Sequence, residues 1–253
     1  MAEPRSLQGK RVLVTGGSGD IGAAMCTAFA QAGAKVAFTW FVSHAGRDAV
    51  TAAIEAAGSE ALAIRANLRE SAATTEISDT LLETWGGVDI LISNAATGVL
   101  KPAMALRDKH FQAVMSVNAT AFLRLAQKLA PTMPAGGRLL ALTSAGSTRA
   151  LENYASIGAS KAALESLVRH LALELGPKGI TVNALCPGVV DTRALVHFPN
   201  RQTILDMARA RTPNGRIVTP ADVADVALFL ASPAASMIQG QTIVVDGGYS
   251  ILA

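Results

Sequence analysis

The sequence has few aromatic residues and no long apolar run, and each shortage excludes a class of protein. Aromatic side chains make up 4% of the 253 residues, whereas 50% of the residues are hydrophobic and most of these are aliphatic. Such a composition is typical of helices packed closely on a buried parallel sheet. No uninterrupted apolar run reaches the ~18–20 residues that a membrane helix requires. We therefore expect no contact with a membrane.

Cysteine is also scarce. Cys26 and Cys186 lie in apolar stretches and are not spaced like metal ligands, so we interpret both as reduced thiols of the core and expect no metal site. The first ten residues are polar and lack the apolar stretch of a secretory signal. Reduced thiols and the missing signal together predict a cytoplasmic location.

The charge is only mildly basic. The net charge is +3, and lysine and arginine form no continuous run that would indicate a nucleic-acid surface. We therefore expect no nucleic-acid partner. A basic surface can attract an acidic protein or a phosphorylated ligand, but an ordinary solvated surface that happens to be basic explains the charge equally well.

Short runs rich in β-branched residues alternate with longer stretches rich in alanine and leucine. The expected strands span residues 11–15, 35–39, 61–65, 88–93, 138–143, 180–185 and 242–245. The expected helices span residues 21–32, 46–57, 71–84, 108–130, 155–175 and 221–231. Without a linker between them, these units predict one α/β domain over residues 1–253: a doubly wound Rossmann fold with a seven-stranded parallel sheet and helices on both faces. Ligands bind such sheets at the carboxyl ends of the strands, where the strand order reverses.

A glycine-rich turn separates the first expected strand from the first expected helix. Gly17, Gly19 and Gly22 fit the G-x-G-x-x-G pattern, in which glycines let the backbone approach a pyrophosphate and the helix start adds partial positive charge. An ordinary glycine-rich loop is the alternative. We expect a nicotinamide dinucleotide at this turn, in contact with Gly16, Ser18, Gly19, Ile21 and Gly22.

The second expected strand ends without a carboxylate. Many dinucleotide sites place an acidic residue about 20 residues after the glycine turn, where it binds the ribose 2′-hydroxyl. Here residues 39–44 read TWFVSH, so no acidic side chain repels a 2′-phosphate. Ser43, His44 and Arg47 are candidates to contact that phosphate, although exposed residues at a helix start explain them as well. We expect NADPH as the cofactor, with NADH possible.

Several segments resemble the short-chain dehydrogenase/reductase superfamily in order and spacing. Thr15, Gly16 and Gly22 match the T-G-x-x-x-G-x-G turn of that family, with Asp20 at the position of its middle glycine. A carboxylate there repels a pyrophosphate unless it turns outward to cap the helix. The resemblance covers nearly the whole chain and continues at residues 93–96, 117–119, 187–188 and 246–248.

The resemblance implies further roles in a nicotinamide site. It places Asn94 and Ala95 near the cofactor's ribose, Asn67 and Leu68 near its adenine, and Asn118 in a proton relay. It also implies that the segment after the sixth strand orients the carboxamide, through Pro187, Gly188, Val190 and Thr192.

Tyr154 and Lys161 are the expected catalytic pair, although their spacing is unusual. Most members of the superfamily place tyrosine four residues before lysine, where this chain has Ile157. Residues seven apart on a helix lie about 10.5 Å apart along the axis and nearly on one face, so both side chains can reach a nicotinamide riboside from one side. Lys161 would bind the ribose and Tyr154 would donate to a developing oxyanion. A loop aromatic and a surface lysine are the alternative.

The Y-x(6)-K spacing is typical of enoyl-acyl-carrier-protein reductases. Together with residues 94–100, 151–154 and 197–201, it makes the chain similar to the NADPH-dependent type III of these enzymes. The type III turn carries a basic residue where this chain has Gly19. Ser144 stands where the commoner bacterial enzymes have a second tyrosine, and it would hydrogen-bond the substrate oxygen or cap its loop.

This resemblance implies reduction of an enoyl thioester carried on acyl carrier protein or coenzyme A, in fatty-acid-type synthesis. A ketoreductase or alcohol dehydrogenase of the same superfamily is one competing hypothesis, and a non-enzymatic dinucleotide-binding protein is the other.

Residues 193–216 mix apolar side chains with several arginines. In the superfamily the corresponding segment covers the substrate as a lid, and an apolar inner face with a basic outer face would suit a fatty acyl group on an acidic carrier protein. A plain amphipathic surface helix explains the pattern almost as well. Residues 108–130 and 155–175 match the helices through which the family forms oligomers, so we expect a homotetramer or a homodimer.

Overall fold

Seven strands form one sheet in the computed structural model, which describes residues 7–198 and 200–252. The strands are β1 (Arg11–Val14), β2 (Lys35–Trp40), β3 (Ala61–Arg65), β4 (Ile90–Ser93), β5 (Arg138–Leu142), β6 (Thr181–Pro187) and β7 (Thr242–Val245). Their order across the sheet is β3-β2-β1-β4-β5-β6-β7, and neighbouring strands pair in parallel. The expected doubly wound α/β fold is confirmed.

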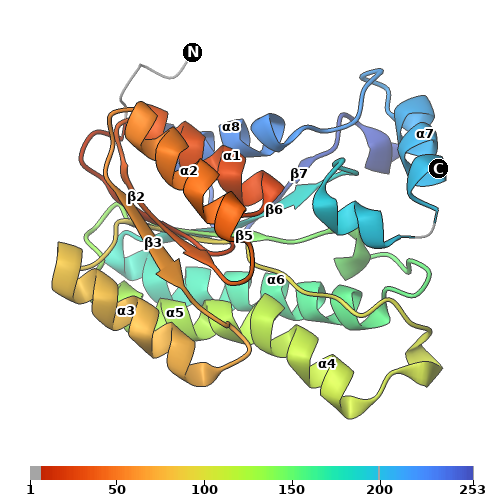
Figure 1. The fold of residues 1–253 in the computed structure, drawn as a ribbon, viewed down its shortest axis with the longest axis horizontal. Helices are drawn as coiled ribbons and strands as arrows, with labels where there is room; N and C mark the ends of the chain where they lie inside the picture. Colours follow the sequence, from red (N-terminus) through yellow and green to blue (C-terminus); the bar gives the residue numbers. More distant parts are fainter. Residues whose placement is uncertain (1–6, 199, 253) are drawn as a thin grey trace.

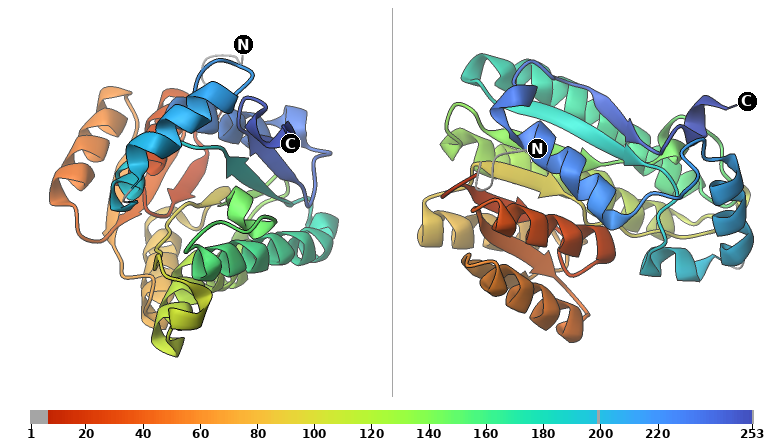
Figure 2. Two further views of the ribbon diagram at one scale, coloured as in Figure 1. Left: turned by 90° about the vertical axis from the view of Figure 1, so that its right-hand side faces the viewer. Right: turned by 90° about the horizontal axis from the view of Figure 1, so that it is seen from above.

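Helices cover both faces of this sheet (Figures 1 and 2). They are α1 (Asp20–Gln31), α2 (His44–Ala56), α3 (Ser71–Trp85), α4 (Asp108–Met115), α5 (Ala121–Leu129), α6 (Ala155–Leu175), α7 (Arg201–Arg211) and α8 (Pro220–Ala231). Helices α1, α2 and α8 lie on one face, and α3, α4, α5 and α6 lie on the other (Figure 1).

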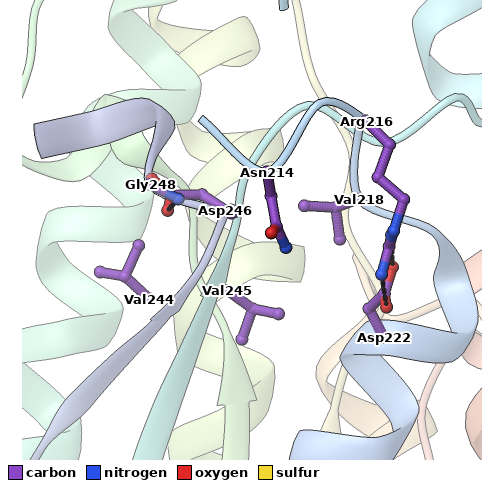
Figure 3. Close-up of a pocket in the computed structure, with 9 residues that line it drawn as sticks. Asn214, Arg216, Val218, Asp222, Val244, Val245, Asp246 and Gly248 are labelled. Atoms are coloured by element: carbon purple, nitrogen blue, oxygen red, sulfur yellow. Dashed lines mark hydrogen bonds and ion pairs between the residues drawn. The ribbon is translucent and has the colours of Figure 1, made fainter. Parts of the chain in front are cut away.

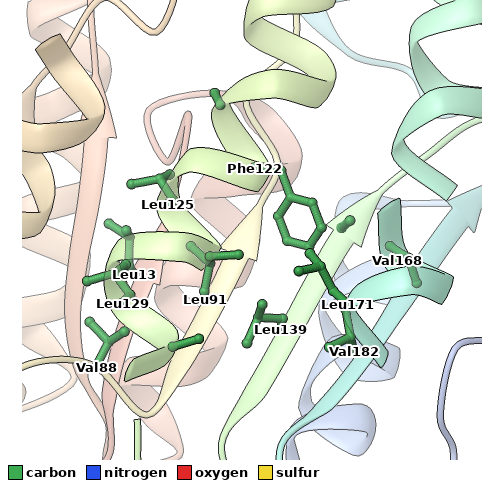
Figure 4. Close-up of a cluster of buried hydrophobic side chains, with 14 of the residues drawn as sticks. Leu13, Val88, Leu91, Phe122, Leu125, Leu129, Leu139, Val168, Leu171 and Val182 are labelled. Carbon is green, nitrogen blue, oxygen red and sulfur yellow. The ribbon is translucent and has the colours of Figure 1, made fainter. Parts of the chain in front are cut away.

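Each face has its own apolar core because successive side chains of a strand point to opposite faces. In β1, Leu13 joins the core shared with α3, α5 and α6 (Figure 4). Val12 and Val14 join the core shared with α1, α2 and α8. Both faces of the central strands are therefore buried, which explains why their sequences are continuously apolar.

Two features differ from the sequence prediction. The expected helix 108–130 is interrupted by a π-helical turn, Ser116–Thr120. Helix α7 lies within residues 193–216, where a surface helix was only the alternative to a lid and no helix bounds were predicted. A π-helical turn holds one residue more than an α-helical turn, and such turns often occur at functional sites. The turn carries Asn118 inward, where it is 1% exposed.

The strand order reverses between β1 and β4, because β2 lies on one side of β1 and β4 on the other. This switch point is where open α/β sheets bind ligands. The 3₁₀ turn Arg193–His197 and α7 lie beyond the carboxyl ends of the strands, at the right in Figure 1. Among the described residues, no helix combines the length and the apolar character needed to cross a membrane.

Candidate active site

The glycine turn is braced against the end of β4. The hydroxyl oxygen of Thr15 accepts hydrogen bonds of 3.0 Å from the backbone N–H groups of Asn94 and Ala95. The side-chain amide of Asn94 donates to the carbonyl oxygens of Thr15 and Gly16, at 3.0 and 3.1 Å. Gly16 has a φ of +66°, and a Cβ there would lie 2.9 Å from the Cα of Ala95, so this contact requires glycine.

A groove of about 740 Å³ follows the carboxyl ends of the first four strands past this turn. Eleven residues expected from the sequence line it: Gly16, Ser18, Gly19, Ile21, Gly22, Ser43, Asn67, Leu68, Asn94, Ala95 and Thr192. Other expected residues lie outside its lining, namely His44, Lys161, Pro187, Gly188 and Val190. The sequence reading missed several lining residues, among them Trp40, Phe41, Arg69 and Arg193. The positions of Trp40 and Phe41 at a strand end were the available signal for those two.

The shape of the groove fits a dinucleotide. Helix α1 begins at the groove, so its first N–H groups and its dipole can hold a pyrophosphate. A Cβ at Gly22 would overlap the carbonyl oxygen of Gly16, and one at Gly19 would lie 3.3 Å from the same oxygen. Side chains at these positions would crowd the turn that receives the phosphates. Asn67 and Leu68 at the end of β3 line the end that would take the adenosine.

Basic side chains surround Trp40 at the end of β2, and we call them the Trp40 cluster: His44, Arg47 and Arg65. The guanidinium carbons of Arg47 and Arg65 lie 5.0 and 5.8 Å from the Trp40 ring centroid. The His44 ring packs edge-on at 4.8 Å. Two of the residues expected near a 2′-phosphate thus lie together, and Arg65 joins them from β3. Ser43 instead caps α2, because its hydroxyl oxygen accepts from the N–H of Gly46 at 3.0 Å.

Tyr154 precedes helix α6, so the expectation that Tyr154 and Lys161 share one helix face is wrong. Tyr154 is the N-cap residue, with φ −106° and ψ 6°. Asn153 before it has a φ of +58°, a left-handed conformation that asparagine tolerates better than most residues. The hydroxyl of Tyr154 donates to the Ser144 hydroxyl oxygen at 3.4 Å. Burial raises the pKa of Tyr154, so its hydroxyl stays protonated at neutral pH.

The Tyr154 ring lies against glycine backbone. A Cβ at Gly146 would come within 2.5 Å of the Cε1 atom of Tyr154, and one at Gly158 would lie 3.9 Å from its Cδ1 atom. The backbone N–H of Gly158 also donates to the carbonyl oxygen of Tyr154 at 2.8 Å. The two glycines therefore set how closely the phenol can approach Ser144.

Gly146→Ala is expected to displace the Tyr154 ring and to lower kcat about 10-fold or more, because the added methyl group occupies the place of the ring edge. The dissociation constant for the nicotinamide cofactor should stay unchanged, since Gly146 does not line the groove. Steady-state kinetics and a nucleotide titration measure the two effects. Gly176→Ala is the matched control, because Gly176 has an ordinary helical φ of −52° and a Cβ there would meet only the side-chain amide of Gln239, at 3.3 Å. Equal kcat in both variants would contradict the positioning role.

Ile157 occupies the position at which most of the superfamily has tyrosine. It lies in the first turn of α6 and is 9% exposed. A Cβ at Gly98 would overlap its Cδ1 atom, so the isoleucine packs directly on the backbone of the segment after β4. This position therefore presents hydrocarbon and no hydroxyl group.

Lys161 is a buried residue, 6% exposed, which excludes the alternative of a surface lysine. Its ammonium group donates to the carbonyl oxygen of Leu142 at the end of β5, at 2.5 Å. Burial lowers the pKa of Lys161 to about 8, although Cys186 and Glu165 act in the opposite direction. The lysine therefore titrates close to physiological pH.

Asn118 uses its side chain to join two elements. Its amide nitrogen donates to the carbonyl oxygen of Thr97 at 3.0 Å and to the hydroxyl of Ser160 at 2.9 Å. Its amide oxygen accepts from the N–H of Thr97 at 2.8 Å. The side chain thus ties the segment after β4 to helix α6. Its participation in a proton relay stays a prediction.

The segment after β6 carries Thr192 to the groove. Gly188 donates its N–H to the carbonyl oxygen of Val245 at 2.9 Å, and a Cβ there would lie 2.8 Å from the Cβ of Asp246. Val190 forms a parallel bridge with Val218. Pro187, Gly188 and Val190 therefore lie behind Thr192 and place it. Within the expected match at residues 197–201, residue 199 lies outside the described residues.

A second, smaller cavity of about 260 Å³ lies beside the edge strand β7 (Figure 3). Arg216 spans it with two hydrogen bonds to Asp222, of 2.6 and 2.7 Å. The pKa of Asp222 lies well below its usual range, chiefly because of this guanidinium. Tyr154 and Lys161 line neither this cavity nor the groove. The groove, however, lies at the switch point of the sheet and includes the glycine turn, so it is the better candidate for the cofactor site.

Comparisons with known proteins agree with this geometry. A family model described as enoyl-(acyl carrier protein) reductase matches residues 17–250. The 1-cyclohexenylcarbonyl-CoA reductase of Streptomyces collinus is 36% identical over 247 residues, covering 95% of this chain and 87% of the relative. The 7alpha-hydroxysteroid dehydrogenase of Escherichia coli strain K12 is 37% identical over 245 residues, covering 96% and 94%. A short-chain dehydrogenase from Burkholderia cenocepacia, solved in complex with NADP, is 36% identical with a TM-score of 0.90 and covers 97% and 99%.

The match to the family model spans the glycine turn, the Tyr154–Lys161 region and the last strand. Relatives that share more than a third of its residues cover nearly the whole chain, and they bear the names of a 1-cyclohexenylcarbonyl-CoA reductase and a hydroxysteroid dehydrogenase. This chain therefore belongs to the short-chain dehydrogenase/reductase superfamily and is an NAD(P)-dependent oxidoreductase.

Proposed function

We propose that the protein reduces the C=C bond of an α,β-unsaturated acyl thioester, carried on acyl carrier protein or coenzyme A. The observation that carries this proposal is the position of Tyr154, which lies just before α6 and beside Ser144. Position 157, where most of the superfamily has the tyrosine, is instead occupied by the hydrocarbon side chain of Ile157. In carbonyl reduction, charge develops on the oxygen bonded to the carbon that accepts hydride. In enoyl reduction it develops on the thioester oxygen, farther from that carbon. A phenol set back from position 157 suits the second geometry.

The bound cofactor supplies a hydride from its reduced nicotinamide ring. Tyr154 donates a hydrogen bond to the thioester oxygen as negative charge develops there, and Ser144 orients that hydroxyl. Lys161, when protonated, supplies positive charge behind the site and binds the ribose. The raised pKa of Tyr154 keeps it a hydrogen-bond donor at neutral pH.

NADPH is the cofactor that we propose. The Trp40 cluster gathers two guanidinium groups and an imidazole at the end of β2, the place where the 2′-substituent of the adenosine ribose would lie. Phosphate binding to arginine is strong because both groups are charged and the guanidinium can donate twice. The lining of the groove agrees, since its acidic residue, Asp20, lies at the glycine turn and not at β2.

Arg65→Ala is expected to raise the KM for NADPH about 10-fold and to leave the KM for NADH within about 2-fold, because only NADPH carries the 2′-phosphate. Initial rates with both cofactors measure the effect. Lys35→Ala is the matched control, since it removes an equally basic, half-exposed side chain at the other end of β2. An equal rise in KM for both cofactors would show that Arg65 supports the groove and does not read the phosphate.

Carbonyl reduction is the second candidate function, because a relative with 37% identity bears the name of a hydroxysteroid dehydrogenase. The test compares NADPH oxidation with a crotonyl thioester and with an acetoacetyl thioester. The proposal expects turnover of the crotonyl substrate. Turnover of the acetoacetyl substrate alone would overturn it in favour of a ketoreductase. A non-enzymatic role does not fit an oxidoreductase of this family.

A further inference from the structure

Asp20 takes the first position of α1, directly at the glycine turn. The start of a helix attracts negative charge, so a carboxylate there competes with the pyrophosphate of a dinucleotide for the same partial positive charge. Left unpaired, Asp20 would weaken cofactor binding.

The structure pairs this carboxylate with Arg193. The backbone N–H of Arg193 donates to one oxygen of Asp20 at 2.7 Å, and its Nε donates to the other at 2.9 Å. The Nη2 group of Arg193 donates to the carbonyl oxygen of Ser18 within the glycine turn, at 2.7 Å. In the described part of the chain, the Nη1 group has no hydrogen-bond partner. Asp20 thus turns toward Arg193 instead of capping the helix.

These contacts fix where the guanidinium lies. Ser18, Asp20 and Arg193 all line the groove, next to the start of α1. The carboxylate and the guanidinium cancel each other in charge, while the unused N–H groups of Nη1 remain available to an anion. Charge-assisted hydrogen bonds from an arginine to phosphate oxygens are strong, and an arginine held in place loses little conformational freedom on binding.

We propose that Arg193 binds the cofactor's pyrophosphate and that Asp20 is the residue that positions it. The glycine turn itself has no basic residue. The guanidinium group of Arg193, which comes from the segment after β6, supplies the positive charge there. Because Arg193 begins the 3₁₀ turn that leads to α7, binding of the pyrophosphate also anchors the start of this segment over the groove. The proposal concerns the dinucleotide and stands whether the substrate is an enoyl or a carbonyl compound.

The test is a titration of the full chain with NADP⁺ and with adenosine 2′-phosphate, followed by tryptophan fluorescence, since Trp40 lines the groove. Arg193→Ala should raise the dissociation constant for NADP⁺ about 30-fold, and that for adenosine 2′-phosphate by less than about 2-fold, because only NADP⁺ carries a pyrophosphate. Binding of adenosine 2′-phosphate also shows that the variant is folded. An unchanged affinity for NADP⁺, or equal losses for both ligands, would overturn the proposal.

Variants of Asp20 test its positioning role. Asp20→Ala should weaken NADP⁺ binding about 3-fold, and Asp20→Asn should restore part of this loss because its oxygen still accepts from Arg193. The double variant Asp20→Ala/Arg193→Ala should bind NADP⁺ better than Arg193→Ala alone, because no bare carboxylate then faces the pyrophosphate. Tighter binding by Asp20→Ala than by the wild type would refute the positioning role. Lys35→Ala again serves as the control for the loss of a positive charge.

Discussion

Tyr154→Phe is expected to lower kcat for an enoyl thioester by about 10²–10³-fold, the usual contribution of one positioned hydrogen-bond donor to a developing oxyanion. The hydroxyl is the only group removed, and the ring keeps its contact with Gly146 and Gly158. The dissociation constant for NADPH should therefore stay within about 2-fold. Stopped-flow or steady-state oxidation of NADPH measures the rate, and a fluorescence titration measures the affinity.

Tyr249→Phe is the control, because Tyr249 is the second of the two tyrosines in the chain and packs against Arg211. We also expect that adding Ile157→Tyr to Tyr154→Phe will not restore enoyl reduction. Ile157 packs on the backbone of Gly98, so a larger ring there must displace that segment, and its hydroxyl would start from a different place. Full recovery in the double variant would show that the spacing of the pair does not define the reaction.

Lys161→Met is expected to stabilise the fold while it removes activity. The pKa of this lysine falls from its usual 10.5 to about 8 on folding, chiefly through burial. Below pH 8 the folded protein therefore carries a desolvated charge that the unfolded chain holds in water, a cost of about 3 kcal/mol. Methionine avoids this cost and loses one hydrogen bond to Leu142, about 1 kcal/mol. We expect a net gain of about 2 kcal/mol at pH 7.

The difference in stability between the wild type and Lys161→Met should depend on pH. Between about pH 8 and pH 10.5 the unfolded state binds more protons at this lysine than the folded state, so the stability of the wild type rises relative to the variant. The advantage of Lys161→Met should therefore shrink as the pH increases across this range. Urea unfolding at several pH values measures it, and Lys178→Met, which removes an exposed lysine, should show no such trend. A constant difference between wild type and variant would contradict the buried charge.

The activity of the wild type should also depend on the titration of Lys161, but it should fall with increasing pH where the stability rises. If Lys161 acts as an ammonium group, kcat/KM of the wild type falls as the pH rises through about 8. If Lys161 served only as a hydrogen-bond donor to the carbonyl oxygen of Leu142, the plot of kcat/KM against pH would show no inflection near pH 8. The two readouts, stability and rate, therefore separate the structural role of Lys161 from its chemical role.

The sequence alone predicted most of the fold, because local patterns are set by the backbone within a few residues. The strands at 61–65 and 242–245 and the helix at 155–175 have the expected bounds, and the others agree within two residues except for the π-helical turn. Runs rich in β-branched residues form the strands, and the stretches rich in alanine and leucine between them form the helices. The glycine turn was also visible, since its signal lies within a short stretch of the chain.

Only the tertiary structure decided how the side chains of the site combine. Arg193 and Asp20 are 173 positions apart, so no local pattern indicates that one supplies the charge missing beside the other. Arg65 meets Trp40 because β3 pairs with β2 in one register. Tyr154 is the N-cap residue and not a helical residue, because Asn153 before it has a left-handed backbone conformation and α6 begins only at Ala155. The residue types that carry the chemistry are readable from the sequence, whereas their distances and charges depend on packing between distant segments.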